Sequence, residues 1–174
     1  MRTILPLQVD RLETPIGEML IVVDDEGNLR ATFWTEKDRA LEPFLARHYA
    51  PARVEFEYVP GPLGPTIALA RYFDGDLRAI DEVPVKTAGT EFQRTVWRAL
   101  RQIPFGTTIS YGELARRIGR PDAVRAVGLA NGANPIGVVV PCHRVIGADG
   151  SLTGYGGGVD RKRWLLDHET RLRL

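Results

Sequence analysis

The chain has 174 residues, of which 44% are hydrophobic and 26% are charged. This composition is typical of a globular protein of one large or two small domains, and it excludes a disordered or fibrous chain. A single cysteine and three histidines exclude an intramolecular disulfide framework and any zinc site built on two or more cysteines. Residues 1–12 lack the apolar core of a signal peptide, and no apolar run approaches the roughly 18 residues of a membrane span. We therefore expect a cytoplasmic protein that needs no metal or other cofactor.

The charges are distributed unevenly along the chain. Residues 1–85 carry 9 Lys and Arg against 15 Asp and Glu, whereas residues 86–174 carry 14 against 7. The first part therefore has a net charge of −6 and the second a net charge of +7, which together give the +1 of the whole chain. The basic second part favours contact with a polyanion, and nucleic acid is the first candidate. The alternative is a chance clustering of charges on solvated faces.

Local patterns in the first 85 residues predict a small α/β domain. Apolar runs on both sides of the polar turn at Gly27 and Asn28 indicate a β-hairpin. Apolar residues then recur at helical spacing, alternate as in a strand, and return to helical spacing after a Pro/Gly cluster. The expected elements, in chain order, are a hairpin within 14–34, a helix over 36–49, a strand over 54–59, a helix through 67–73 and a linker over 81–87.

The remaining residues, 86–174, predict a mostly helical domain. Thr90, Ser110 and Asp122 each precede apolar residues at helical spacing, and all three are residue types that cap helix N-termini. Glu113 lies three residues after Ser110, which is the spacing of a capping box. The helices expected here cover residues 92–100, 111–118, 123–131 and 160–170.

The helices expected at 111–118 and 123–131 are separated by a short turn, Gly119-Arg120-Pro121, and form a candidate helix-turn-helix. Plain core packing of two neighbouring helices explains the same pattern equally well. The second helix is rich in Ala and Gly, and Arg125 is nearly its only long polar side chain. Helices that read the major groove usually present several long polar side chains to base edges. We therefore expect this helix to press its backbone closely against a partner.

The candidate nucleophile is Cys142, which follows an apolar run. Residues Val138 to Val140 predict a buried strand that ends at Pro141, because proline cannot donate to a β-ladder. A lone cytosolic cysteine is most often an inert buried side chain, but His143 is the next residue here. Neighbouring side chains of an extended chain point to opposite faces, so we expect the thiol proton to reach His143 through a bridging water. Glu169 could in turn orient His143 and stabilise its cation.

The residues around this cysteine resemble the active-site signature of the O6-alkylguanine-DNA alkyltransferases. The signature here is Pro141-Cys142-His143-Arg144-Val145, and the similarity extends in the family's order over roughly residues 88–170. The first half of the chain is similar only loosely, through Thr14-Pro15-Ile16-Gly17 and its hairpin. The further matching segments are Phe92-Gln93, Val96-Trp97, Ile103-Pro104-Phe105-Gly106, Ser110-Tyr111, Arg125-Ala126-Val127-Gly128, Asn134-Pro135, Gly154-Tyr155-Gly156-Gly157-Gly158 and Trp164-Leu165-Leu166.

The resemblance implies an α+β fold with two domains. Residues 1–85 would form an N-terminal α/β domain, with a small antiparallel sheet and helices in an RNase H-like arrangement. Residues 86–174 would form a mostly helical, winged-helix-like domain that contains the helix-turn-helix and carries DNA binding and alkyl transfer. Some family members bind zinc in the N-terminal half, but this chain has only His48 and no cysteine there. We therefore expect no metal site in this chain.

The resemblance also implies a suicidal DNA-repair reaction. O6-alkylated guanine, and O4-alkylated thymine, would be flipped out of duplex DNA, and the alkyl group would move irreversibly to the cysteine. The implied catalytic residues are Cys142 as nucleophile, His143 as its base through a water, Glu169 as the residue that orients His143, and Asn134 as the brace of the turn. The implied substrate-binding groups are Tyr111, Val145, Tyr155 and Gly156. The implied DNA contacts are Arg125, which fills the space of the flipped nucleotide, and Ala126, Gly128 and Tyr111.

The expected partner is double-stranded DNA, bound through its minor groove with little sequence dependence by a protein that is monomeric when free. Three alternatives stand beside this interpretation. A helix-turn-helix transcription factor usually has base-reading side chains and a dimerisation element, a Cys-His hydrolase leaves its thiol intact, and a non-catalytic alkyltransferase-like binder lacks the cysteine. The presence of Cys142 favours the alkyltransferase over the non-catalytic binder.

Overall fold

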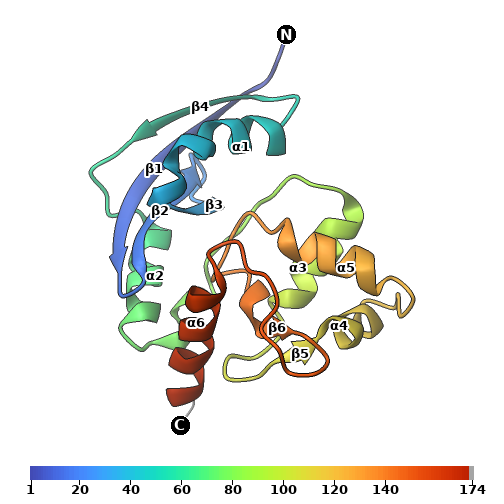
Figure 1. Cartoon of the computed structure of the whole chain (residues 1–174). Coiled ribbons are helices and arrows are strands. Elements are labelled where there is room, and N and C mark those ends of the chain that lie inside the picture. The colour runs from blue at the N-terminus through green and yellow to red at the C-terminus, as the bar shows by residue number, and fades with distance from the viewer. Residues whose placement is uncertain (173–174) are drawn as a thin grey trace. The chain divides into compact units, whose positions relative to one another are not determined.

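The computed structural model of the chain describes residues 1–172. The chain divides into two compact units, Met1–Gly89 and Thr90–Leu174, and Figure 1 shows the elements of each. Among residues 1–172, no helix is both long and apolar enough to cross a membrane.

The first unit is built on a four-stranded sheet with the strand order β3-β2-β1-β4. Its strands are β1 (Ile4–Thr14), β2 (Gly17–Asp24), β3 (Leu29–Trp34) and β4 (Arg53–Tyr58). β2 runs antiparallel to β3, as the hairpin pattern predicts, and also to β1, but β4 pairs with β1 in parallel. The expectation of an antiparallel sheet is therefore wrong, and the sheet is mixed. A local pattern indicates that β4 is a strand, but it carries no information about which strand it joins or in which direction.

The strand β1 is absent from the sequence-based prediction because polar residues interrupt its apolar pattern. One of them, Asp10, is buried in the structure. Its carboxylate accepts hydrogen bonds from the backbone amide of Leu63 (3.1 Å) and from the hydroxyl of Thr66 (2.7 Å). These contacts stabilise a polar side chain in the interior, which a hydrophobicity pattern reports as exposed.

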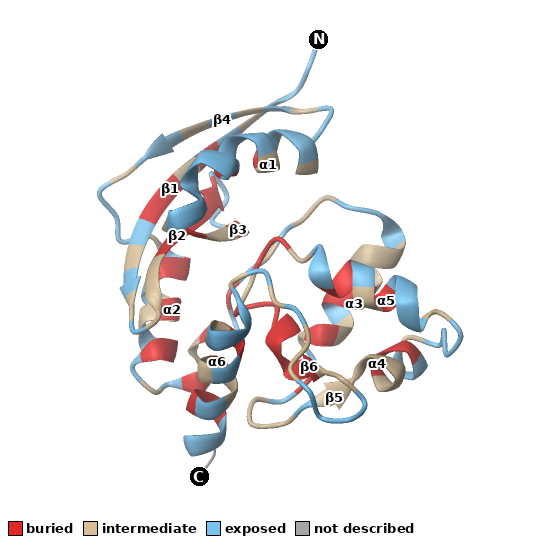
Figure 2. Cartoon of the chain, viewed as in Figure 1, coloured by how far each residue is buried: buried red, intermediate tan, exposed pale blue. Residues whose placement is uncertain are grey.

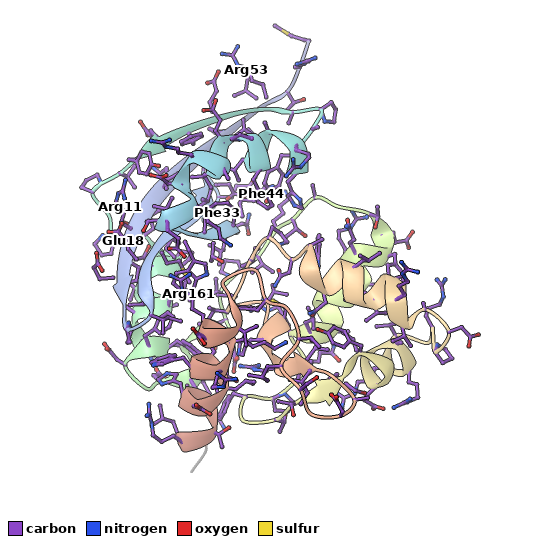
Figure 3. All side chains as sticks on the ribbon, viewed as in Figure 1. Arg11, Glu18, Phe33, Phe44, Arg53 and Arg161 are labelled. Atoms are coloured by element: carbon purple, nitrogen blue, oxygen red, sulfur yellow. The ribbon has the colours of Figure 1, made fainter. Side chains whose placement is uncertain are left out.

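Helices lie on both faces of this sheet. Leu41 and Leu45 of α1 (Leu41–His48), which follows the 3₁₀ segment η1 (Thr35–Ala40), pack into a core cluster with Val9 of β1. The neighbouring Asp10 binds Thr66 of α2 (Gly64–Phe73), and adjacent residues of a strand face opposite sides. Therefore α1 and α2 cover opposite faces. Figure 3 shows Phe33 of β3 beside Phe44 of α1, with ring centroids 5.5 Å apart.

The segment expected to be a linker, residues 81–87, instead joins the first unit. The backbone amide of Leu29 donates to the carbonyl of Pro84 (2.8 Å), and the amide of Lys86 donates to the carbonyl of Leu29 (3.1 Å). This segment follows the short 3₁₀ helix η2 (Leu77–Ile80). Its pairing with the start of β3 explains why the first unit extends to Gly89 rather than ending at residue 85.

The second unit is mostly helical. Its elements are α3 (Glu91–Leu100), β5 (Ile109–Ser110), α4 (Tyr111–Arg117), α5 (Val124–Gly132), η3 (Cys142–Arg144), β6 (Val145–Ile146) and α6 (Val159–Arg171). Thr90 and Gln93 form a complete capping box at α3, and the hydroxyl of Ser110 accepts from the amide of Glu113 at α4. The predicted cap at Asp122 is wrong, because α5 begins after Ala123 without a side-chain cap.

The two helices of the expected helix-turn-helix, α4 and α5, pack within the core of the second unit. α5 packs on both α3 and α4, and the indole of Trp97 donates to the backbone carbonyl of Ala130 (2.9 Å). β5 and β6 pair in parallel, with Ile109 opposite Val145. The chain leading into β6 is buried (Figure 2), and α6 packs against it. This buried segment contains Cys142.

A first prediction concerns the buried hydroxyl of Tyr49, which donates to the carbonyls of Arg30 (2.7 Å) and Lys86 (3.3 Å). Tyr49→Phe leaves these carbonyls without that donor, so we expect the free energy of unfolding to fall by about 1–2 kcal/mol. Burial raises the pKa of Tyr49 to about 12, above its usual value of about 10 in an unfolded chain. The wild-type protein should therefore lose stability as the pH rises above about 10, and the variant should lose less. Urea unfolding at neutral and alkaline pH measures both effects, and equal slopes with pH would contradict the assignment.

Candidate active site

The predicted strand at Val138–Val140 is absent, and the chain forms two tight turns there instead. The amide of Val139 donates to the carbonyl of Gly137 (2.9 Å), and the amide of Cys142 donates to the carbonyl of Val140 (2.8 Å). Val138, at the centre of the first turn, has a φ of 71°, which is strained for a β-branched residue. The apolar run correctly indicated burial, but a buried turn with internal hydrogen bonds has the same sequence pattern as a buried strand.

The side chain of Asn134 braces this turn at two points. Its amide nitrogen donates to the carbonyl of Val140 (2.8 Å), and its amide oxygen accepts from the backbone amide of Ile136 (2.9 Å). The Val140 carbonyl also accepts the bond from Cys142. The side chain of Asn134 and the backbone amide of Cys142 therefore bind the same oxygen, that of Val140, and these bonds stabilise the strained turn.

The imidazole of His143 is fixed by a buried carboxylate from α6. Nε2 of His143 lies 2.8 Å from Oε1 of Glu169, and both side chains are fully buried. Arg144 holds the same carboxylate through two bonds, Nε to Oε2 (3.0 Å) and Nη2 to Oε1 (2.8 Å). A third bond runs from Nη1 of Arg144 to the carbonyl of Ile103 (2.6 Å). Arg144 was not predicted as a site residue, although its place directly after His143 in the sequence could have suggested it.

This arrangement sets the protonation of the imidazole. Burial alone would raise the pKa of Glu169, but the hydrogen bonds and charges of His143 and Arg144 outweigh burial and hold this pKa well below its usual range. Burial lowers the pKa of His143, although Glu169 opposes the shift. An ionised carboxylate only accepts, so Nε2 of a neutral His143 carries the proton and Nδ1 carries the lone pair. Nδ1 is buried and has no hydrogen-bond partner within residues 1–172.

The thiol of Cys142 lies in a buried environment that contains one lysine. The residue is 8% exposed, and burial raises the pKa of its thiol, while a hydrogen bond from Asn134 and the charge of Lys162 act in the opposite direction. Lys162 is fully buried on α6, and its Nζ donates to the carbonyls of Val145 (2.7 Å) and Thr153 (3.3 Å). Sequence reasoning missed Lys162. Its spacing of seven residues from Glu169 puts both on one helix face, and that spacing is the signal that could have found it.

Two tyrosines lie near the cysteine segment. Tyr111 begins α4 directly after β5, which pairs with the β6 strand that follows η3. Its hydroxyl lies 2.6 Å from the hydroxyl of Thr153. Tyr155 belongs to the loop before α6, and burial raises the pKa of its hydroxyl well above the usual range, with the nearby Cys142 contributing. Gly156, the next residue, is exposed.

The residues expected to contact DNA lie on α5. Arg125 and Ala126 are exposed, and Gly128 is half-buried. A Cβ added at Gly128 would lie 3.8 Å from the ring of Tyr111. The structure thus places Cys142, His143 and Val145 in one buried segment, with Asn134 bonded to the turn before it and Glu169 bonded to His143, and it puts Arg125 on the exposed surface of α5. Within residues 1–172, no three His, Cys, Asp or Glu side chains are grouped so as to hold a metal ion.

Comparison with known proteins gives consistent matches. Residues 91–171 match the family model of the 6-O-methylguanine DNA methyltransferase DNA-binding domain. A methylated-DNA–protein-cysteine methyltransferase of Salmonella typhimurium is 50% identical over 170 residues, which cover 98% of this chain and 99% of that protein. A protein of the same name from Mycobacterium tuberculosis is 55% identical over 126 residues, 72% of this chain and 76% of that one.

Solved structures show the same fold. The O6-methylguanine methyltransferase of Mycobacterium tuberculosis superposes with a TM-score of 0.74 at 40% identity, covering 95% of this chain and 93% of that one. A structure of Mycobacterium tuberculosis OGT in complex with DNA gives a TM-score of 0.73 at 38% identity, covering 95% and 94%. These structures share the α+β architecture of the present chain.

The buried carboxylate predicts a pH-dependent loss of stability. Glu169→Gln leaves the buried guanidinium of Arg144 without its counter-charge, so we expect a loss of about 3–5 kcal/mol at neutral pH. Because the pKa of Glu169 is lowered in the folded protein, its stabilisation is complete above the ordinary carboxyl pKa of 4.5 and is lost as the pH falls below that value. Denaturant unfolding at neutral and acidic pH should show a smaller difference between wild type and variant in acid.

Glu113→Gln is the matched control for this prediction. Glu113 also accepts from two arginines, Arg116 and Arg117, but its carboxylate is exposed on α4. We expect only a small change in stability, because solvent screens exposed ion pairs. Equal effects of the two substitutions, or a difference for Glu169→Gln that does not shrink in acid, would show that the buried carboxylate is not the stabilising group.

Proposed function

Because the chain belongs to the O6-methylguanine-DNA methyltransferase family, we propose that it removes alkyl groups from O6 of guanine in duplex DNA by irreversible transfer to Cys142. The observation that carries this proposal is the oriented imidazole of His143. Its Nε2 faces Glu169, its other nitrogen is buried without a hydrogen-bond partner within residues 1–172, and the residue next to it in the sequence is the only cysteine of the chain. A nucleophile needs such a base, and the base needs a third group that fixes its tautomer.

The proposed reaction is a displacement at the alkyl carbon. The thiol of Cys142 gives its proton, through a bridging water, to the lone pair on Nδ1 of His143. The sulfur then forms a bond to the alkyl carbon while the bond from that carbon to O6 breaks, and its electron pair remains on the guanine oxygen. A proton from the site neutralises the guanine that leaves. The sum is one thiol and one alkylated guanine giving one thioether and one guanine, so no cofactor takes part.

Glu169 and Lys162 stabilise the two charges that this proton transfer creates, the imidazolium of His143 and the thiolate of Cys142. The Glu169 carboxylate stabilises the imidazolium that forms when His143 takes the proton. Lys162 donates to the Val145 carbonyl and places a positive charge near Cys142, which favours the thiolate over the neutral thiol. Burial has the opposite effect on the thiol pKa. We therefore infer that the thiol rests in its neutral form and is deprotonated as the substrate binds.

Access to the alkyl carbon requires that the base leaves the stack. We propose that α5 lies in the minor groove, that Arg125 fills the space of the flipped nucleotide, and that Ala126 and Gly128 allow close contact with the sugar-phosphate backbone. Tyr111, Tyr155, Gly156 and the Val145 carbonyl would read the flipped base. The exposure of Arg125 and Ala126 on α5 and the +7 charge of residues 86–174 support this mode of binding. A Mycobacterium tuberculosis relative was solved in complex with DNA.

Finer parts of the proposal rest on the family resemblance. They are repair of O4-alkylated thymine, an RNase H-like first domain, a winged-helix-like second domain with its helix-turn-helix, a monomeric free protein and a cytoplasmic location.

One protein molecule should remove one alkyl group, because the site offers a single acceptor thiol. Incubation with a duplex oligonucleotide that contains O6-methylguanine should add one CH2 unit to the protein mass, and peptide mapping should locate it at Cys142. Cys142→Ala should bind the same DNA and transfer nothing. Repair of many equivalents per protein, or a methyl group on another residue, would contradict the proposed function and point to hydrolysis or to a different acceptor.

Arg125→Ala should slow repair of duplex DNA far more than transfer from the free O6-alkylated base, because only the duplex requires nucleotide flipping. Arg163→Ala is the matched control, since Arg163 is an exposed arginine of α6 to which no role in flipping is assigned. For this variant, the ratio of the transfer rate from duplex DNA to the transfer rate from the free base should match the wild-type ratio. Equal losses on both substrates for Arg125→Ala would show that this residue does not support flipping.

Alkylation should destabilise the protein. Cys142 is 8% exposed and sits in a turn that is strained at Val138 and braced by Asn134. An added carbon overpacks such a site, which typically costs about 1–3 kcal/mol. The methylated protein should therefore melt at a lower temperature than the free protein in differential scanning calorimetry. An unchanged or raised melting temperature would mean that the pocket accepts the methyl group without strain.

A further inference from the structure

We propose that Thr153 is a positioning residue that orients the hydroxyl of Tyr111 toward the flipped base. This inference rests on the proposed function and deepens it, because it adds a residue of the loop before α6 to the groups that control alkyl transfer. It is carried by the 2.6 Å contact between the two hydroxyl oxygens.

The position of Tyr111 relative to the nucleophile follows from the short parallel pairing of β5 and β6. Ile109 lies opposite Val145, and Ser110 lies opposite Ile146. Tyr111 is the next residue along the first strand, while β6 directly follows the turn of Cys142. Tyr111 is therefore the first residue of α4, and it lies beside the segment that contains Cys142.

Thr153 is itself fixed to the same segment through a buried lysine. Its backbone carbonyl accepts from Nζ of Lys162 (3.3 Å), and the same Nζ donates to the carbonyl of Val145 (2.7 Å). Lys162 is fully buried, so its two carbonyl contacts are shielded from competing solvent. Thr153 thus binds the Tyr111 hydroxyl through its side chain and Lys162 through its backbone carbonyl, and Lys162 in turn binds the Val145 carbonyl. The Tyr111 hydroxyl and the Val145 carbonyl are both proposed to read the base.

The direction of the hydroxyl contact follows from the chemistry required of the phenol. A tyrosine hydroxyl has one proton to donate. If Tyr111 donates that proton to the guanine, where negative charge develops as O6 leaves, then Thr153 must be the donor in the contact between the two hydroxyls. Accepting this bond makes the phenol a stronger donor. The ring of Tyr111 also lies next to Gly128 of α5, but that contact is apolar and does not orient the hydroxyl.

Single-turnover transfer from O6-methylguanine duplex DNA tests this role with Thr153→Val and Thr153→Ser. Valine removes the hydroxyl at nearly equal size and keeps the backbone carbonyl that Lys162 uses. We expect Thr153→Val to slow transfer about 3- to 10-fold, the effect of one hydrogen bond, with unchanged affinity for undamaged duplex. Thr153→Ser should restore the rate to within about 2-fold of wild type, because it restores the hydroxyl.

The decisive comparison is a double-mutant cycle with Tyr111→Phe. If Thr153 acts through the phenol, adding Thr153→Val to the Tyr111→Phe variant should cause no further slowing. Thr107→Val is the matched control, since the Thr107 hydroxyl also makes a 2.6 Å bond, but to the backbone carbonyl of Pro104. It should transfer at the wild-type rate.

Three results would overturn the inference. They are a wild-type transfer rate for Thr153→Val, a Thr153→Ser variant as slow as Thr153→Val, and an equal effect of Thr153→Val with and without Tyr111→Phe. Failure of the proposed function gives a different result, because the wild-type protein would then transfer no methyl group to Cys142 in the same assay.

Discussion

The buried carboxylate of Glu169 is the interaction on which the second unit depends. An ionised carboxylate without partners is very costly in a protein interior, and this one is stabilised by the bidentate guanidinium of Arg144 and by His143. Arg144 also reaches the carbonyl of Ile103. Three segments far apart in the sequence, the end of α6, the turn η3 and the chain after α3, are therefore held together at one charged group. The turn η3, which contains Cys142, is thereby bonded to α6.

The same burial sets the chemistry of the site. It raises the pKa of Cys142 and lowers that of His143, so the resting pair is a neutral thiol and a neutral imidazole. Glu169 fixes which nitrogen of the imidazole carries the proton, and Lys162 supplies a positive charge close to the sulfur. Burial thus favours the neutral thiol of Cys142, which is less reactive than the thiolate.

The first unit also contains buried carboxylates that are stabilised by hydrogen bonds. Asp24 is buried, and its carboxylate accepts from Arg30 (2.7 Å) and from the backbone amide of Asn28 (2.9 Å). Burial raises the pKa of Asp24, but these hydrogen bonds outweigh it and the pKa is lowered. Asp10 likewise accepts from a loop amide and from a threonine hydroxyl of α2. In both units a buried carboxylate binds the groups of a nearby turn, and in the second unit the imidazole that it binds belongs to the residue after Cys142.

Sequence alone determined the features that depend on neighbours along the chain. The hairpin of β2 and β3, the caps at Thr90 and Ser110, the helices and the motif around Cys142 all follow from local spacing and residue type. It failed where distant partners decide. β1 was missed because the partners of Asp10 lie more than fifty residues away. The turn at Val138 to Val140 was missed for another reason: its bonds are local, but a buried turn has the same apolar pattern as a buried strand. The proton position on His143 and the roles of Arg144 and Lys162 were likewise decided by tertiary structure. The physical reason is that a local pattern records how apolar a segment is, whereas the burial of a charge is possible only where the fold supplies its partners.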